Sequence, residues 1–131
     1  MKILILGAGL MQKPAILTAK ELGYTVHVVD ADKNALCINL CDEFKQIDLK
    51  DKEKILEYAK EINSDGQLKA VFTAGTDFSA SVSYVCEKLK LHAHSLEAAL
   101  NASIKTQMRK CFLDNNIPSP IFFRCNKEQE N

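Results

Sequence analysis

Short apolar runs alternate with segments of helical periodicity along most of the chain. Residues 2–7 are almost wholly apolar and end in glycine, which is typical of a strand buried on both faces of a parallel sheet. Residues 13–22 place apolar side chains at helical spacing, with Pro14 in the first turn and Gly23 as the stop signal. Residues 25–30 are rich in β-branched side chains and predict a second strand.

The alternation continues towards the carboxyl terminus. Residues 51–63 carry apolar side chains on one helical face and charges on the other, and Asp51 is placed to cap the amino-terminal end. Ser95 is placed in the same way before a further helical turn. The remaining predicted strands cover residues 44–47, 70–73, 91–93 and 121–123, and the remaining predicted helices cover residues 35–41, 78–90 and 104–113.

The order of these elements predicts the fold class. Strands that alternate with helices favour an α/β fold with a doubly wound, Rossmann-like parallel sheet and helices on both faces. A chain of 131 residues fits one domain, which we expect to span residues 1–125. Residues 126–131 are polar and are expected to form a frayed tail.

Charge and hydropathy exclude several classes of function. The chain has 17 basic and 17 acidic side chains, so it lacks the positive field that nucleic-acid binding requires. No apolar run reaches the roughly 20 residues needed to span a bilayer. The apolar run at residues 3–6 is too short for the core of a signal peptide. We therefore expect a cytoplasmic protein that binds neither nucleic acid nor membrane.

The cysteines and histidines predict no metal site. The number of cysteines is 5, which is odd, and no pair has the Cys-x-x-Cys spacing of zinc or redox sites. Cys37 and Cys41 lie close together in the sequence and are interpreted as small buried side chains. His92 and His94 would share one face of a short strand, but no third ligand lies near them in the sequence.

Three loops are the candidate binding loops. Ligands on doubly wound sheets bind beyond the carboxyl ends of the strands. The loops at those ends are loop 1 (residues 7–13), loop 2 (residues 30–32) and loop 3 (residues 75–77). Loop 1 contains glycines, which let the backbone approach a ligand closely, and the helix that follows it favours an anion at its amino-terminal end.

Loop 1 nearly matches the fingerprint of dinucleotide-binding folds. Gly7 and Gly9 fit Gly-x-Gly, and Asp30 lies where a ribose-binding acid belongs. Gln12 stands where the third glycine is needed for close packing of helix on strand. A tight turn without a ligand and a solvated Asp30 remain the alternatives for these residues. A helix cap remains the alternative for Thr76 and Asp77 in loop 3.

Several short stretches of the chain occur in a characteristic order: residues 5–9, 19–24, 29–35, 42–44, 73–77, 105 and 116–120. None of them is specific alone, and their order and spacing carry the information. Together they resemble the N-terminal, or pre-ATP-grasp, domain of the ATP-grasp ligases. This family includes the large subunit of carbamoyl phosphate synthetase, biotin carboxylase and glycinamide ribonucleotide synthetase. The resemblance runs from Lys2 to about Phe122.

The resemblance implies an ATP-dependent ligase. Such an enzyme uses ATP and Mg²⁺ to convert a carboxylate into an acylphosphate, which an amine or another nucleophile then attacks. The N-terminal domain supplies part of the surface for a small carboxylate or amine substrate. Lys105 holds the position from which related ligases send a basic side chain to an ATP phosphate, but Ile104 precedes it where Asp or Asn is usual. The implied substrate-contacting residues are Gly7, Gly9, Leu10, Met11, Gln12, Asp30, Gly75, Thr76 and Asp77.

The resemblance also implies that further domains are needed. The nucleotide-clamping sheet and the magnesium-binding carboxylates of the family would follow residue 131. We therefore expect this chain to hold no catalytic residue, no metal ligand and no tightly bound cofactor, and to be inactive alone. The ATP-grasp domains would belong to the same longer chain or to a separate subunit. Phe112 and residues 121–123 would face those domains or would complete the core of this one.

Two other classes of function remain open. One is a nucleotide- or dinucleotide-binding Rossmann module, which binding of NADH or NADPH would favour. The other is a non-catalytic interaction domain that kept the fold and lost the chemistry. The acceptor substrate, the nucleophile and the oligomeric state, including a homodimer, are left open by the sequence.

Overall fold

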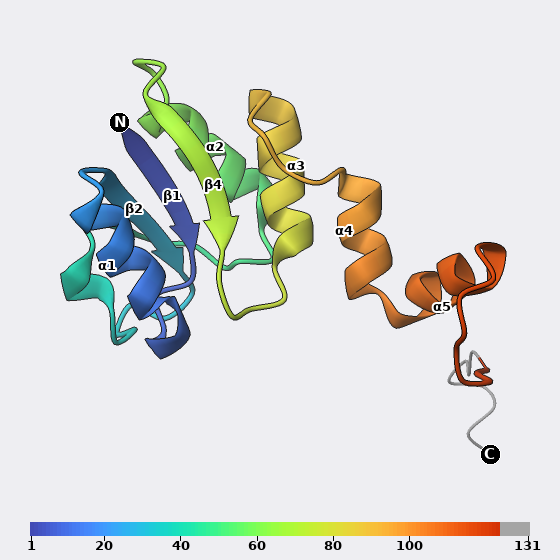
Figure 1. The fold of residues 1–131 in the computed structure, drawn as a ribbon. Coiled ribbons are helices and arrows are strands. Elements are labelled where there is room, and N and C mark those ends of the chain that lie inside the picture. Colours follow the sequence, from blue (N-terminus) through green and yellow to red (C-terminus); the bar gives the residue numbers. More distant parts are fainter. Residues whose placement is uncertain (124–131) are drawn as a thin grey trace.

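The computed structural model describes residues 1–123 and contains one parallel sheet with the strand order β3-β2-β1-β4 (Figure 1). The α/β fold class is therefore confirmed. The strands are β1 (Lys2–Leu6), β2 (Thr25–Asp30), β3 (Glu43–Gln46) and β4 (Leu68–Thr73). The helices are α1 (Lys13–Glu21), α2 (Lys52–Ile62), α3 (Ser79–Leu89), α4 (Leu96–Ser103) and α5 (Lys105–Asp114), with 3-10 turns η1 (Leu10–Gln12) and η2 (Ile38–Leu40).

The sheet is covered on both faces, as the doubly wound fold requires. Successive side chains of a strand point to opposite faces. Figure 1 shows α1 on one face of the sheet and α2 and α3 on the other. Ile3 and Ile5 of β1 pack in the cluster with α1, and Leu4 and Leu6 pack in the cluster with α2 and α3. This explains why residues 3–6 of the first strand are apolar on both faces of the sheet. The strand order reverses between β1 and β4, so loops 1 and 3 flank the switch point.

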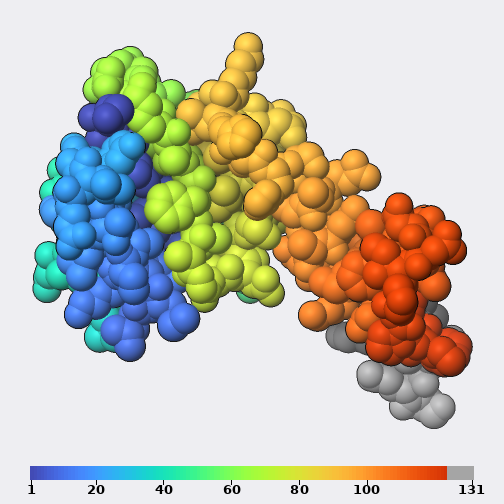
Figure 2. All heavy atoms as spheres, viewed as in Figure 1, coloured from blue at the N-terminus to red at the C-terminus, as the bar shows by residue number. Residues whose placement is uncertain are grey.

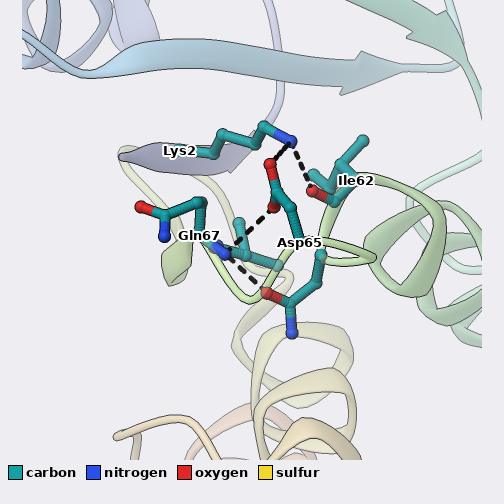
Figure 3. Close-up of polar contacts among 6 residues, drawn as sticks. Lys2, Ile62, Asp65 and Gln67 are labelled. Atoms are coloured by element: carbon teal, nitrogen blue, oxygen red, sulfur yellow. Dashed lines mark hydrogen bonds and ion pairs between the residues drawn. The ribbon is translucent and has the colours of Figure 1, made fainter.

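A polar cluster lies at the amino-terminal ends of β1 and β4, opposite to the candidate binding loops (Figure 3). The Lys2 ammonium donates to the Ile62 carbonyl at 3.0 Å and pairs with the Asp65 carboxylate at 2.8 Å. Asp65 also accepts from the Gln67 backbone N–H at 3.1 Å. Lys2 thus satisfies a carbonyl at the carboxyl end of α2, where a cation is favoured by the helix dipole.

The predicted strand at residues 91–93 is wrong. Lys90 adopts a left-handed conformation with φ 56°, and the Leu91 N–H donates to the Cys86 carbonyl at 2.9 Å. This hydrogen bond closes the carboxyl end of α3, so the Leu91 N–H is used by the helix cap. His92 and His94 are exposed in the segment before α4.

The predicted strand at residues 121–123 is also wrong, as is the idea that these residues complete the core. Ile121 is 90% exposed and Phe123 is 85% exposed, while Phe112 and Phe122 are only partly buried. Pro118 and Pro120 precede the segment, and proline has no N–H for a strand ladder. No residue of α5 is buried, and Figure 2 shows this helix as a lobe beyond α4, away from the sheet.

Other predicted elements shift or shorten. The predicted helix at residues 35–41 is reduced to η2, and the third strand begins one residue earlier than expected, at Glu43. The caps are confirmed, because Asp51 accepts from the Lys54 N–H and Ser95 accepts from the Ala98 N–H, each at 3.1 Å. The predicted tail at residues 126–131 lies outside the described residues.

The cysteines of residues 1–123 are free thiols. Cys37 and Cys86 are buried, and Cys41 and Cys111 are partly buried, so the expectation of a buried side chain holds fully for Cys37 and only in part for Cys41. Cys125 lies outside the described residues. Within residues 1–123 no group of three or more potential metal ligands is found, and no helix there is long and apolar enough to cross a membrane.

Two buried serines of α3 allow a test of its packing. Ser83 is fully buried, and its hydroxyl has no hydrogen-bond partner among residues 1–123. An unsatisfied buried hydroxyl is destabilising, and alanine has the higher helix propensity. We expect Ser83→Ala to raise the free energy of unfolding by about 1 kcal/mol, measured by urea denaturation.

The matched control is Ser81, which is also buried in α3. Its hydroxyl donates to the Leu49 carbonyl at 2.7 Å. Ser81→Ala is therefore expected to lower the free energy of unfolding by about 1 kcal/mol. Equal effects of the two substitutions would contradict this account of the hydroxyl groups.

Candidate functional site

Loops 1, 2 and 3 meet at the carboxyl ends of the parallel strands, as the sequence predicts. The Ala8 N–H of loop 1 donates to the Asp30 carboxylate of loop 2 at 2.7 Å. The Gln12 side-chain amide donates to the carbonyl of Ala74, the residue before loop 3. The structure thus joins residues from three parts of the chain into one loop cluster.

Gln12 is the central residue of this cluster. Its side chain is 3% exposed, and its Oε1 accepts from the Gly9 N–H at 2.9 Å. A Cβ atom at Gly7, where φ is +104°, would lie 3.0 Å from the Gln12 side chain, and a Cβ at Gly9 would lie 3.1 Å from it. Both glycines therefore make room for glutamine. The sequence identified Gln12 only as a missing glycine and as a substrate contact, whereas the structure buries it between loops 1 and 3.

Asp30 also acts within the protein. One carboxylate oxygen accepts from the Ala8 N–H, and the other accepts from the Asp32 N–H at 2.9 Å. The alternative of a merely solvated carboxylate is therefore wrong. Both oxygens already have donors, and Asp30 holds loops 1 and 2 together.

The outer surface of loop 1 is apolar. Leu10 is 65% exposed and Met11 is 68% exposed. Gly75 of loop 3 packs against Met11, because a Cβ at Gly75 would lie only 2.8 Å from the Met11 Cβ. A ligand that approaches the loop cluster would therefore contact two large apolar side chains, of which Met11 packs against loop 3.

Loop 3 does not cap α3. The cap position is Phe78, which makes no side-chain hydrogen bond, so the alternative of a helix cap at Thr76 or Asp77 is wrong. The Thr76 hydroxyl lies 3.3 Å from the Thr73 hydroxyl, which donates to the Leu6 carbonyl. Asp77 is exposed and makes no hydrogen bond or ion pair among residues 1–123. Its carboxylate is thus available to a ligand.

Hydrogen bonds inside the cluster limit the ligands that loop 1 can bind. A phosphate bound at such a loop is held by free backbone N–H groups. Here the Ala8 N–H is bonded to Asp30 and the Gly9 N–H is bonded to Gln12. Loop 1 therefore does not offer these two donors to the pyrophosphate of a dinucleotide.

Lys105 lies away from the loop cluster. It is the first residue of α5 and is exposed, on the side of α4 that is remote from the sheet (Figure 1). It lines a shallow cavity of about 260 Å³ together with Arg109, Phe122 and Phe123. Lys105 and the three loops therefore form separate sites in this chain.

A further cavity, of about 370 Å³, was not identified from the sequence. It lies between the turn before α2, the start of α3, and α4. One signal could have indicated it. Lys50 and Lys52 flank the cap residue Asp51 at the amino-terminal end of α2, where the helix dipole disfavours cations.

Known proteins match parts of this chain. No protein-family model matches it. Over 64 residues, or 49% of the chain, it is 41% identical to a formate-dependent phosphoribosylglycinamide formyltransferase from Prochlorococcus marinus subsp. pastoris. The aligned residues cover 16% of that protein.

Solved structures match most of the chain. A phosphoribosylglycinamide synthetase from Anaerococcus prevotii has a TM-score of 0.74 and 29% identity, over 88% of this chain and 29% of its own. An N5-carboxyaminoimidazole ribonucleotide synthetase from Thermotoga maritima has a TM-score of 0.70 at 20% identity, over 92% of this chain and 32% of its own, which shows the fold alone. This chain thus spans about a third or less of these proteins.

These similarities have a common feature, since the proteins are ligases with further domains and the match falls on their first third. In fold along most of its length, and in sequence over about half of it, the chain resembles the N-terminal domain of the ATP-grasp ligases.

Proposed function

We propose that this chain is the substrate-side N-terminal domain of an ATP-grasp ligase. The complete enzyme would activate a small carboxylate as an acylphosphate and transfer it to an amine or a similar nucleophile, in the manner of carbamoyl phosphate synthetase. ATP and Mg²⁺ would supply the phosphoryl group and its charge neutralisation in the complete enzyme. Two of the similar structures are described as ADP complexes, which supports a nucleotide in the complete enzyme. We also propose that the enzyme is cytoplasmic.

The loop cluster would provide the acceptor side of the active site. Leu10 and Met11 would contact the apolar part of the acceptor, and Gly75 would allow loop 3 to support Met11. Thr76 and Asp77 would offer polar groups at the rim. Gly7, Gly9, Gln12 and Asp30 would hold the loops in place, because their contacts are within the protein.

The observation that carries the proposal is the use of the loop 1 donors by Asp30 and Gln12. The competing function, a dinucleotide-binding Rossmann module, needs free N–H groups at this loop. It also needs the Asp30 carboxylate for the ribose, and each oxygen of Asp30 already accepts one hydrogen bond within the protein, so fewer of its acceptor positions remain for a ligand. The geometry of loop 1 therefore favours the ligase domain.

The carboxyl-terminal segment would face the ATP-grasp domains. Ile117, Ile121 and Phe123 are exposed by 47%, 90% and 85%, and α5 buries none of its side chains. Exposed apolar groups of this size are typical of a surface that another domain covers. Lys105, at the start of α5, would then contact a phosphate of ATP, so the chain alone would not catalyse the reaction.

The ligase function can be tested by joining this chain to the ATP-grasp domains of the Anaerococcus prevotii synthetase, in place of that enzyme's own first third. We expect ADP release that depends on a carboxylate and on the presence of this chain. Exchange of the exposed Leu10 for serine should lower kcat/KM without changing the melting temperature. ADP release by the ATP-grasp domains alone, at an equal rate, would contradict the proposal.

A second measurement does not depend on the fusion. Thermal unfolding of the chain is followed with NADH, NADPH and magnesium-ATP. A ligand at 100 times its Kd stabilises the native state by about 2.7 kcal/mol, which gives a melting shift of several degrees. We expect no shift with either nicotinamide cofactor. A shift with NADH or NADPH would support the Rossmann module instead.

A further inference from the structure

The cavity beside α4 has walls of two kinds. Its apolar wall is formed by Phe78 at the start of α3 and by Leu96 and Leu100 of α4. Charges of both signs also line it, from Lys50 and Lys52 and from Asp77. A volume of about 370 Å³ lies within the range of about 300–1,000 Å³ that is usual for small-molecule pockets.

The charges that line the cavity are not used by the protein itself. Within residues 1–123, neither Lys50 nor Asp77 forms an ion pair. Lys52 lies over the Tyr84 ring at 4.4 Å from its centroid, which restrains its ammonium group but leaves the charge uncompensated by a carboxylate. Lys50 is therefore the freer of the two cations.

The position of the lysines is unfavourable for the fold. The amino-terminal end of a helix has a partial positive charge, so a cation there costs about 0.3–1 kcal/mol. The start of α3 faces the same cavity, and its cap residue Phe78 provides no side-chain acceptor for the free N–H groups. The two lysines and the start of α3 thus bring positive charge to the cavity, which a carboxylate would neutralise.

We propose that this cavity binds a free α-amino acid with an apolar side chain. The carboxylate would pair with Lys50, with Lys52 and the start of α3 adding to the attraction. The ammonium group would pair with Asp77, and the side chain would lie against Phe78, Leu96 and Leu100. A zwitterion with an apolar group satisfies all three parts of the cavity, whereas a simple anion leaves Asp77 unpaired and unfavourably placed.

Binding at this cavity needs neither ATP nor the ATP-grasp domains, and the cavity shares Asp77 with the proposed acceptor side of the ligase site. The test is titration of the chain with L-leucine and L-phenylalanine at millimolar concentrations, followed by ¹H–¹⁵N NMR shifts. We expect saturable shifts at the residues that line the cavity. Leucinamide and 4-methylpentanoate each lack one charged group and should bind about two- to fivefold more weakly, because an exposed ion pair contributes about 1 kcal/mol or less. Glycine lacks the apolar group and should bind about tenfold more weakly.

Matched variants assign the contacts. Lys50→Gln should remove the preference for leucine over leucinamide, and Asp77→Asn should remove the preference for leucine over 4-methylpentanoate. The controls are Lys60→Gln in α2 and Glu87→Gln in α3, the helices that follow Lys50 and Asp77. Both control residues lie outside the cavity and should leave affinity unchanged. Absence of saturable shifts with both amino acids, or an unchanged preference for leucine in both Lys50→Gln and Asp77→Asn, would overturn the proposal. Neither result would affect the ADP-release test of the ligase function.

Discussion

Gly7→Ala is expected to lower the free energy of unfolding by about 3 kcal/mol. Gly7 has φ +104°, a conformation that is unfavourable for any residue with a Cβ. The added Cβ would also lie 3.0 Å from the buried Gln12 side chain, which is fixed at both ends by hydrogen bonds to Gly9 and Ala74. Backbone strain and overpacking therefore act together at this position. Urea denaturation of the variant measures the effect.

Gly23→Ala is the matched control. Gly23 also has a positive φ, of +80°, but a Cβ there would have no atom within 4 Å. Only backbone strain remains, and the expected loss is about 1–2 kcal/mol. Adding Gln12→Ala to Gly7→Ala should recover part of the loss, because the two residues are in contact and their effects should not be additive. Equal losses of unfolding free energy in Gly7→Ala and Gly23→Ala, together with additive effects of Gly7→Ala and Gln12→Ala, would contradict the proposed packing.

The second large effect is a loss of stability in mild acid through His27. This side chain of β2 is 7% exposed, and its Nδ1 lies 3.1 Å from the Tyr58 hydroxyl. Its Nε2 has no partner among residues 1–123. Burial lowers the pKa of His27 and the nearby Lys2 lowers it further, while Glu43 and Asp42 oppose these effects. Burial also raises the pKa of Tyr58 to about 12, so the neutral phenol is its stable partner.

The sign of the effect follows from proton binding. The unfolded chain, with a histidine pKa of about 6.5, binds a proton that the folded chain resists. The stability from neutral His27 is therefore complete above that pKa and falls as the pH drops towards the lowered pKa of the folded state. The slope is at most about 1.4 kcal/mol per pH unit. It is measured by urea denaturation between pH 7 and pH 5 (about the range above carboxylate titration).

Two variants identify the source of this slope. His27→Gln should remove most of it, whatever its effect on stability at neutral pH. The double variant His92→Gln and His94→Gln removes two exposed histidines and should leave the slope intact. If the double variant flattened the profile and His27→Gln did not, the buried imidazole would not be the titrating group.

Local patterns predicted much of the fold correctly. The β-branched run at residues 25–30 coincides with β2, and the caps Asp51 and Ser95 mark the true starts of α2 and α4. These features depend on neighbours in the sequence. The strand predicted at residues 91–93 is wrong because the Leu91 N–H closes the carboxyl end of α3, and the alternation of side chains in this segment does not reveal that hydrogen bond.

The candidate site was predicted less completely, because its decisive contacts are between distant parts of the chain. The carboxyl-end rule for parallel strands placed the three loops together. It did not show that Gln12 bonds to Ala74, 62 positions away, or that Asp30 bonds to Ala8. Composition also could not indicate that α5 buries none of its residues, since Phe112 and Ile121 would be apolar in a core and on an interface alike.

The Gln12 side chain has a consequence for how the site would respond to an occupant. One end of its amide holds Gly9 and the other holds Ala74, so a displacement of loop 1 is transmitted to loop 3 through one rigid group. Met11 rests on Gly75 and couples the same loops a second time. An acceptor molecule that displaces Leu10 and Met11 would therefore also displace loop 3, which carries Asp77 on the other side of the switch point. Loops 1 and 3 would move together.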